Sequence, residues 1–315
     1  MLKVGEFIDY YNLVGFMSKR INRNNFVNYI TGYSFVIPPL IFVVLFIMVP
    51  VFKSFYLSFT SWRGLGEPSF TGLRNYINLF TKDPAFYIAL KNSLLFQFGA
   101  TAGTILVGLI LALLIDLKIR FWRFYRFVFF LPVVLSTIAI GFMWQKVFDP
   151  YGLLNTILEA LTLDRFAIIW LGQSQWLAMG IIVFVTIWQY SGFPMLFFLA
   201  GLQNIDPEIY EAARIDGAST IKRIIHVSIP LLKNVFSVII VLQLIFSFKV
   251  FGIVWVMTQG GPANLTEVLG THLYKVAFTG QSFGYGSVIA VLIFIVSMIY
   301  AYLYTRISGY KNTLK

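Results

Sequence analysis

The sequence predicts an all-α membrane protein with six transmembrane helices and with both termini in the cytoplasm. Of its 315 residues, 58% are hydrophobic and 18% aromatic, and only 12% are charged, about half the share found in soluble globular proteins. Six apolar runs approach the roughly twenty residues with which a helix crosses a bilayer. Most of the 24 lysines and arginines lie on one side of these runs. Together these observations predict a helix bundle in lipid.

The predicted domain organisation follows from the apolar runs. Residues 1–32 are expected to form a cytoplasmic segment with an interfacial helix, residues 33–307 the transmembrane domain, and residues 308–315 a cytoplasmic tail. Each span must be helical, because the bilayer core offers no partner to an unpaired backbone group. The spans are predicted at about 34–54, 92–115, 125–147, 176–199, 235–257 and 286–306. Prolines lie within or at the ends of several spans, where kinks are tolerated: Pro38, Pro39, Pro50, Pro132 and Pro194.

The positive charges predict the orientation. With the N-terminus inside, 15 lysines and arginines fall in cytoplasmic segments and 7 in outer segments, while Lys146 and Lys249 lie in or beside spans. This excess agrees with the positive-inside rule. It places residues 60–93 outside, where we expect ordered structure, and residues 203–232 inside. Membrane orientation thereby accounts for the net charge of +11, and the sequence predicts no nucleic-acid partner.

A long, densely charged segment, residues 210–230, interrupts the apolar second half of the chain, and Asp206 and Pro207 precede it. Asp206 is predicted to cap a first helix by accepting hydrogen bonds from free backbone N–H groups. Gly217 is expected to let the chain leave this helix with a positive φ. Ser219 or Thr220 can cap a second, short helix. The segment therefore predicts two helices joined by a tight turn, between two membrane spans.

This segment resembles the EAA loop of ABC importer permeases. The family pattern is Glu-Ala-Ala, three residues, Gly, nine residues and then Ile-x-Leu-Pro, and the chain ends the pattern with Val-Ser-Ile-Pro. The resemblance implies that the loop at 203–232 docks into a cytoplasmic ATPase and couples it to transport; the alternative is a surface loop with no docking role. The coupling residues implied are Glu211, Ala212, Ala213, Asp216, Gly217 and Pro230.

Further stretches resemble carbohydrate-type permeases related to maltose and glycerol-3-phosphate uptake, so that the likeness runs from about residue 34 to the end. They include residues 129–132, 148–157, 198–203, 246–251 and 258–262. The resemblance implies a type I ABC importer permease-like bundle in the prokaryotic cytoplasmic membrane, translocating a sugar or oligosaccharide. It also implies a second homologous permease subunit, two ATPase subunits that bind ATP and Mg²⁺, and an extracytoplasmic solute-binding protein.

A sugar path requires polar and aromatic groups at mid-depth in the membrane, and the fourth and fifth predicted spans contain both. The alternative is that these aromatic side chains only pack between helices. The resemblance to maltose-type permeases implies a path lined by Val133, Thr137, Tyr190, Ser191, Gly192, Met195, Gln243, Phe246, Ser247 and Val250.

Lys249 is a further candidate for the path. The family commonly has an aspartate three residues after this lysine, and this chain has Gly252 instead. An ammonium group in a span must pair, snorkel or reach water. Lys249 is therefore either a structural lysine or a path residue that favours an acidic glycan, and a neutral oligosaccharide is the preferred expectation.

Two other classes of function are less well supported by the sequence. A self-contained secondary transporter would need carboxylates within the membrane, and Asp116 is the nearest candidate. A membrane enzyme would need converging catalytic groups, whereas His226 and His272 are far apart in the sequence and are expected to be surface or interface residues. The chain has no cysteine and no phosphate-binding glycine loop, so no catalytic, cofactor or metal site is predicted.

Overall fold

The computed structural model describes residues 33–118, 120–247 and 250–307. Its contacts divide the chain after Tyr56 into two units, which are described separately. The predictions for residues 1–32, for residues 308–315 and for Lys249 lie outside the described residues.

The first unit is an apolar helix that continues to Ser58 and confirms the first predicted span. Helix runs from Tyr33 to Ser58, with a π-helical turn η1 (Val44–Met48) followed by α2 (Val49–Ser58). Pro50 has no N–H to donate to the carbonyl of Phe46 and crowds it, which accounts for the wider turn at this point. The side chains of residues 33–50 are all exposed. A helix that is apolar on all sides is suited to burial in lipid or against another protein.

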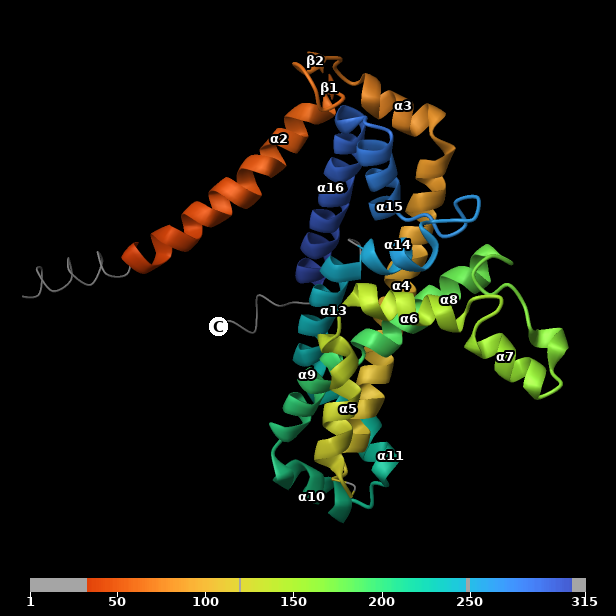
Figure 1. Cartoon of the computed structure of the whole chain (residues 1–315). Coiled ribbons are helices and arrows are strands. Elements are labelled where there is room, and N and C mark those ends of the chain that lie inside the picture. Colours follow the sequence, from red (N-terminus) through yellow and green to blue (C-terminus); the bar gives the residue numbers. More distant parts are fainter. Residues whose placement is uncertain (1–32, 119, 248–249, 308–315) are drawn as a thin grey trace, which may run out of the picture. The chain divides into compact units, whose positions relative to one another are not determined.

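The second unit is a helical bundle with one short hairpin (Figure 1). Its hairpin and first helices are β1 (Thr60–Ser61), β2 (Ser69–Phe70), α3 (Arg74–Lys82) and α4 (Pro84–Asp116). The middle elements are α5 (Trp122–Val134), α6 (Thr137–Val147), α7 (Leu153–Ala160), η2 (Asp164–Phe166), α8 (Gln175–Tyr190) and α9 (Gly192–Gln203). The remainder are α10 (Pro207–Ile215), α11 (Thr220–Arg223), η3 (Ile224–Ser228), α12 (Ile229–Leu231), α13 (Lys233–Ser247), α14 (Gly252–Thr258), α15 (Leu269–Tyr274), η4 (Lys275–Thr279) and α16 (Phe283–Ile307).

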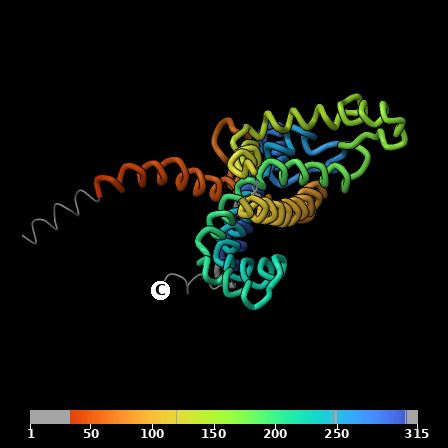
Figure 2. The backbone as a smooth tube through the Cα atoms, turned by 90° about the horizontal axis from the view of Figure 1, so that it is seen from below, coloured from red at the N-terminus to blue at the C-terminus, as the bar shows by residue number. Residues whose placement is uncertain are grey.

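Helix α4 is the centre of the second unit and packs against α8, α9, α13 and α15 (Figure 2). It has 33 residues and is longer than the second predicted span. A helix of this length measures about 50 Å, whereas the hydrocarbon core is about 30 Å thick. It begins early because the side chain of Asp83 accepts a hydrogen bond from the Phe86 N–H, and Pro84 occupies the first turn.

Two predicted spans, 125–147 and 176–199, are bent helix pairs rather than continuous helices, and a third bent pair joins the charged loop to the first half of the predicted span 235–257. The bend is 97° between α5 and α6, 45° between α8 and α9, and 66° between residues 220–231 and 233–244. The predicted span 125–147 contains a helix break, at which Leu135 and Ser136 have extended ψ angles of 149° and 127°. The predicted span 235–257 is also divided, since α13 ends at Ser247 and α14 begins at Gly252. If each bent pair counts as one span, the described residues contain six spans, as predicted.

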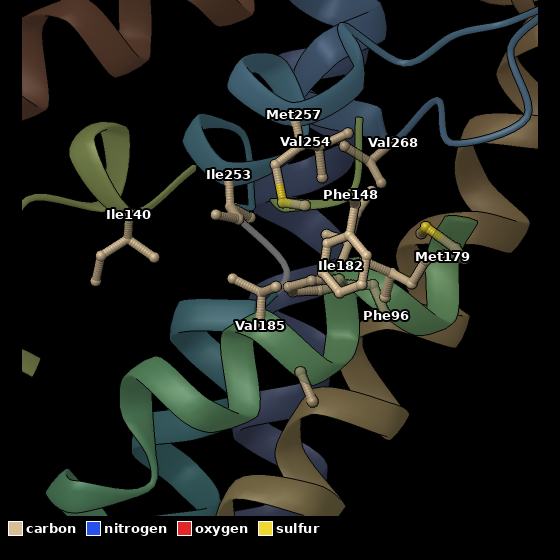
Figure 3. Packing of buried hydrophobic residues seen from close by; sticks show 12 residues of the cluster. Phe96, Ile140, Phe148, Met179, Ile182, Val185, Ile253, Val254, Met257 and Val268 are labelled. Atoms are coloured by element: carbon tan, nitrogen blue, oxygen red, sulfur yellow. The ribbon is translucent and has the colours of Figure 1, made fainter. Parts of the chain in front are cut away.

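The bundle has three clusters of buried apolar residues. One lies where α4, α6, α8 and α14 meet and includes Phe96, Ile182 and Val254 (Figure 3). A second packs α4 against α9 and α13, and a third packs α3 and α4 against α15 and α16. The first and second clusters together fix the positions of α4, α8, α9 and α14, the helices that surround the site described below.

The segment predicted to be ordered outside the membrane is ordered. The strands β1 and β2 pair antiparallel with Thr60 opposite Phe70. The side-chain amide of Asn75, in α3, donates to the carbonyls of Ser58 and Thr60 at 3.0 and 2.8 Å. These bonds fix α3 against the end of α2 and against β1, because the amide provides a donor for one carbonyl of each element.

Asp83 joins three elements at the start of α4. Its Oδ2 lies 3.0 Å from His272 Nε2, in α15, and accepts a hydrogen bond of 3.0 Å from the Tyr285 hydroxyl, in α16. His272 was expected at a surface or interface but is 7% exposed, and the Asp83 carboxylate provides its ring with a partner there. Burial raises the pKa of Asp83, but the charge of His272, the Phe86 amide and the Tyr285 hydroxyl outweigh it, so the pKa lies below its ordinary value of 3.8.

We expect Asp83→Asn to lower the free energy of unfolding by about 2 kcal/mol, since it removes the carboxylate oxygen that contacts His272 and accepts a hydrogen bond from Tyr285. The exposed Asp164→Asn is the control. Because the folded pKa is lowered, the stabilisation is complete above pH 3.8 and is lost as the pH falls further. The difference in melting temperature between the parent protein and Asp83→Asn should therefore shrink below that pH. A difference that is constant down to pH 3 would contradict this account.

Candidate functional site

A cavity of about 380 Å³ lies at the middle of the second unit, beside the bends of α5–α6 and α8–α9. Its lining contains aromatic, aliphatic, hydroxyl and amide side chains and no charged residue among those described. The lining residues are Phe96, Ala100, Thr104, Val133, Thr137, Thr186, Tyr190, Phe193, Gln243, Phe246, Val250, Phe251, Gly252 and Ile253.

The polar groups of the cavity are organised around Thr137, the first residue of α6. Its hydroxyl lies 2.7 Å from the Tyr190 hydroxyl and accepts a hydrogen bond of 3.2 Å from the Gln189 side-chain amide. The same amide lies 3.4 Å from the carbonyl of Leu135, one of the two extended residues at the helix break. At the break the Leu135 carbonyl is free of the helix ladder, and the Gln189 amide provides it with a partner while the same amide donates to the Thr137 hydroxyl of the lining.

This lining can bind an uncharged polar solute. Hydroxyl and amide groups can exchange hydrogen bonds with a solute, and the rings of Phe193 and Phe246 can cover its apolar surface. General acid–base catalysis needs a titratable side chain within reach of the reacting group, and the described lining supplies only the phenol of Tyr190. The arrangement is that of a binding or passage site.

Six of the predicted path residues line this cavity: Val133, Thr137, Tyr190, Gln243, Phe246 and Val250. Ser191 and Met195 are 4% and 0% exposed and are not part of the lining. The side chain of Ser247 and all of Lys249 lie outside the described residues. That the whole set forms a substrate path stays a prediction.

Gly192 does not line the cavity but lies where two helices pack closely against each other. A Cβ atom at this residue would overlap the carbonyl oxygen of Phe129 and lie 2.9 Å from Phe130 Cα, in the backbone of α5. Glycine at this position lets α9 approach α5 closely, immediately after the bend at Ser191. The resemblance identified the position, but the sequence alone did not show that its neighbour is a helix backbone.

Helix α4 contributes lining residues that the sequence analysis missed. Phe96, Ala100 and Thr104 follow one another at intervals of four residues and therefore share one face of the helix. This spacing was visible in the sequence, and the small side chains at 100 and 104 could have indicated a helix face that leaves space beside it. Thr186 and Phe193, around the α8–α9 bend, were also missed.

The charged loop has the predicted structure. Asp206 accepts a hydrogen bond from the Glu208 N–H at 3.0 Å and caps α10, and Ser219 rather than Thr220 caps α11, accepting from the Lys222 N–H at 3.4 Å. Gly217 has φ +76°, and no atom lies within 4 Å of a Cβ built on it. Its glycine requirement is therefore conformational rather than steric.

The loop has exposed apolar side chains, and hydrogen bonds hold its short helices together. Ile215 is 87% exposed, Ile221 is 69% exposed and Ile225 is 51% exposed. The Tyr210 hydroxyl lies 3.0 Å from the Ser228 hydroxyl and ties α10 to η3. Pro230 follows η3 as Pro50 follows η1, so the wider turn again lies where a proline crowds a preceding carbonyl. Exposed apolar residues grouped in a charged segment are typical of a protein-binding surface.

All the coupling residues implied by the resemblance lie in or directly beside the short helices of the charged loop. Glu211, Ala212 and Ala213 are in α10, Asp216 ends it, and Gly217 forms the turn. A second cavity, of about 520 Å³, separates α10 and α11 from the last turn of α4, and it is lined by both positive and negative side chains, including Glu211, Arg214 and Arg223. The loop is thus a distinct projection at the end of the bundle away from β1 and β2 (Figure 1).

Comparison with known proteins identifies relatives over most of the chain. The chain is 40% identical over 275 residues to the probable ABC transporter permease protein YurN of Bacillus subtilis, which covers 86% of this chain and 93% of that protein. It is 35% identical over 278 residues to the multiple sugar-binding transport system permease protein MsmF of Streptococcus mutans, covering 88% and 94%.

A similar fold occurs in a solved structure. A chain of a bacterial ABC transporter involved in the import of the acidic polysaccharide alginate matches with a TM-score of 0.78 and 21% identity, over 93% of this chain and 98% of that one. At this identity the likeness concerns the fold. Residues 104–309 match the family described as binding-protein-dependent transport system inner membrane component. The chain therefore belongs to this family of ABC transporter permeases, the membrane subunits that translocate a solute without catalysing a reaction themselves.

Proposed function

We propose that the chain translocates a sugar or oligosaccharide through the central cavity. The observation that carries this proposal is the lining, which combines aromatic rings with hydroxyl and amide groups and in which no described residue is charged. Sugars present hydroxyl groups at their edges and apolar C–H groups on their faces, so they match both kinds of side chain. The name of the relative MsmF, a multiple sugar-binding transport system permease, supports the same substrate class.

The chain works with partner subunits. An extracytoplasmic binding protein delivers the solute, a second homologous permease completes the pathway, and two ATPase subunits bind ATP and Mg²⁺. The exposed isoleucines of α10, α11 and η3, held by two helix caps, are the surface that docks into an ATPase. The protein lies in the prokaryotic cytoplasmic membrane with this loop and both termini inside, as the lysine and arginine excess indicates.

Co-purification and uptake test this proposal. An affinity-tagged chain, extracted in mild detergent, should bring down an ABC ATPase and a second permease, whereas a self-contained secondary transporter would not. Proteoliposomes containing the complex and the binding protein should take up a glycan only when ATP is present on the loop side. Uptake driven by an ion gradient without ATP would refute the importer assignment.

The orientation has a direct test because the chain has no cysteine. Leu65, beyond β1, and Leu117, at the end of α4, have apolar side chains that are 90% and 61% exposed. A membrane-impermeant thiol reagent applied to intact cells should label Leu65→Cys and not Leu117→Cys, and permeabilised cells should show both labelled. Labelling of Leu117→Cys alone in intact cells would reverse the orientation and remove the ATPase contact.

A further inference from the structure

Six aromatic rings form a continuous series in the outer half of the second unit, which we name the aromatic ladder. Its members are Trp62, Phe283, Phe278, Tyr274, Trp255 and Phe251. The centroid separations along it are 5.5 Å, 5.5 Å, 5.2 Å, 4.6 Å and 5.6 Å in this order. Tyr274 also contacts Phe251 directly, at 5.4 Å.

The ladder connects the outer end of the bundle with the central cavity. Phe251 belongs both to the ladder and to the cavity lining. Trp62 follows β1, at the end of the unit away from α10 and α11 (Figure 1). Rings from the hairpin, from α16, from η4 and α15, and from α14 therefore lie in sequence between the outer surface and the cavity.

The outermost ring is held in a fixed orientation. The indole Nε1–H of Trp62 donates to the carbonyl of Gly66 at 2.9 Å, and the Trp62 carbonyl accepts a hydrogen bond from the Gly284 N–H at 3.2 Å. These two bonds tie the loop after β1 to the start of α16. A rigid aromatic face needs little conformational ordering when a ligand stacks on it.

The ladder differs from the core in its exposure. Aromatic side chains that only pack between helices are closed off here, as Phe86 and Phe198 show at 2% and 0% exposure. None of the six ladder residues is buried, and Phe278, in the middle of the series, is 57% exposed. The nearby cation Lys275 is paired with Glu267, so the surroundings of Phe278 carry a compensated charge. The rings of the ladder are therefore partly accessible, and the charged pair beside the most exposed of them is neutral overall.

We propose that the aromatic ladder is a row of stacking subsites that guides an oligosaccharide from the outer surface into the cavity. The inference rests on the proposed function and extends it to substrate length, because a series of rings that reaches the cavity can engage several sugar units at once. Each sugar unit places its apolar C–H face against a ring while its hydroxyl groups remain in water. A mono- or disaccharide would occupy the cavity alone and gain little from the ladder.

The first test asks whether the aromatic ladder faces a water-filled path or instead faces lipid or another subunit. Phe278→Cys is introduced into the complete complex, with Phe98→Cys as the control, since Phe98 is also 57% exposed but lies on α4 outside the ladder. A charged, hydrophilic methanethiosulfonate reagent should label Phe278→Cys rapidly and Phe98→Cys slowly. Equally slow labelling at both positions would overturn the proposal, because the ladder would then face lipid or another subunit.

The second test uses chain length. Malto-, cello- and xylo-oligosaccharides of two and six units are compared, and the series that stimulates ATP hydrolysis is used for uptake. Phe278→Leu keeps an apolar side chain but removes the ring face, and should raise the KM for the six-unit sugar at least fivefold relative to the two-unit sugar. Phe278→Trp should preserve the KM values, and Phe98→Leu should change neither.

The outcomes distinguish the two proposals. Equal effects of Phe278→Leu on both lengths, at equal membrane abundance, would refute the ladder while leaving sugar import intact. Stimulation of ATP hydrolysis by amino acids and by none of the glycans would refute the proposed function itself. Protection of Phe278→Cys from the thiol reagent by the six-unit sugar, and not by the two-unit sugar, would support the ladder independently of transport rates.

Discussion

Gly217→Val is expected to abolish solute uptake while the chain still inserts into the membrane. Gly217 has φ +76°, and a β-branched residue in this conformation costs on the order of 1–3 kcal/mol. The space around the position is open, so the strain can be relieved only by changing the turn and with it the angle between α10 and α11. Coupling that depends on this angle should then fail, with uptake reduced by about tenfold or more.

The control for this variant is Gly180→Val. Gly180, in α8, also has open space around it, with no atom within 4 Å of a Cβ built on it, but its φ is not positive. Uptake and membrane abundance are measured for both variants, and ATPase association by co-purification. Normal uptake by Gly217→Val at equal abundance would show that the loop geometry has no role in coupling.

Val133→Trp is expected to block uptake by filling the central cavity. Val133 lines the cavity from α5, together with residues of α13 and α14, and an indole ring would occupy a large part of the roughly 380 Å³ that the structure leaves open. The loss should be at least tenfold in the rate of uptake. Because the loop is untouched, the ATPase should remain associated, which separates blockage from loss of coupling.

The neighbouring residue gives a matched control. Val134 is 70% exposed and does not line the cavity, so Val134→Trp adds the same ring next to the same helix break but outside the cavity. Uptake should be close to normal in this variant. If both tryptophan variants lose uptake equally, the defect lies in the helix break at residues 135–136, and the cavity would lose its assignment as the solute path.

The charged loop could be predicted in detail because its structure depends on local chemistry. An acidic N-cap followed by proline, a glycine at a helix end and a serine cap each act within a few residues, and the structure confirms all of them. The apolar spans were also predictable, because the thickness of the bilayer sets their length and its apolar core sets their composition.

The helix breaks could not be predicted because they depend on tertiary contacts. The residue types at Leu135 and Ser136 give no sign of a helix break. The side-chain amide of Gln189, on another helix, lies near the Leu135 carbonyl and replaces the hydrogen bond that the carbonyl loses at the break. His272 was misplaced for a similar reason, because its partner Asp83 is 189 residues away in the sequence. The cavity arises where these breaks meet, so its α4 residues were missed while its α5, α6 and α13 residues were found by resemblance.

The central claim is that this permease admits sugars, and substrate-stimulated ATP hydrolysis measures it most directly. The complex of this chain with its partner permease and ATPases is reconstituted with the binding protein, and hydrolysis is recorded with neutral oligosaccharides, uronate oligomers, amino acids and metal ions. Neutral oligosaccharides should stimulate hydrolysis several-fold, and Val133→Trp should abolish their uptake. Stimulation by amino acids or metal ions, with no response to any glycan, would contradict the account.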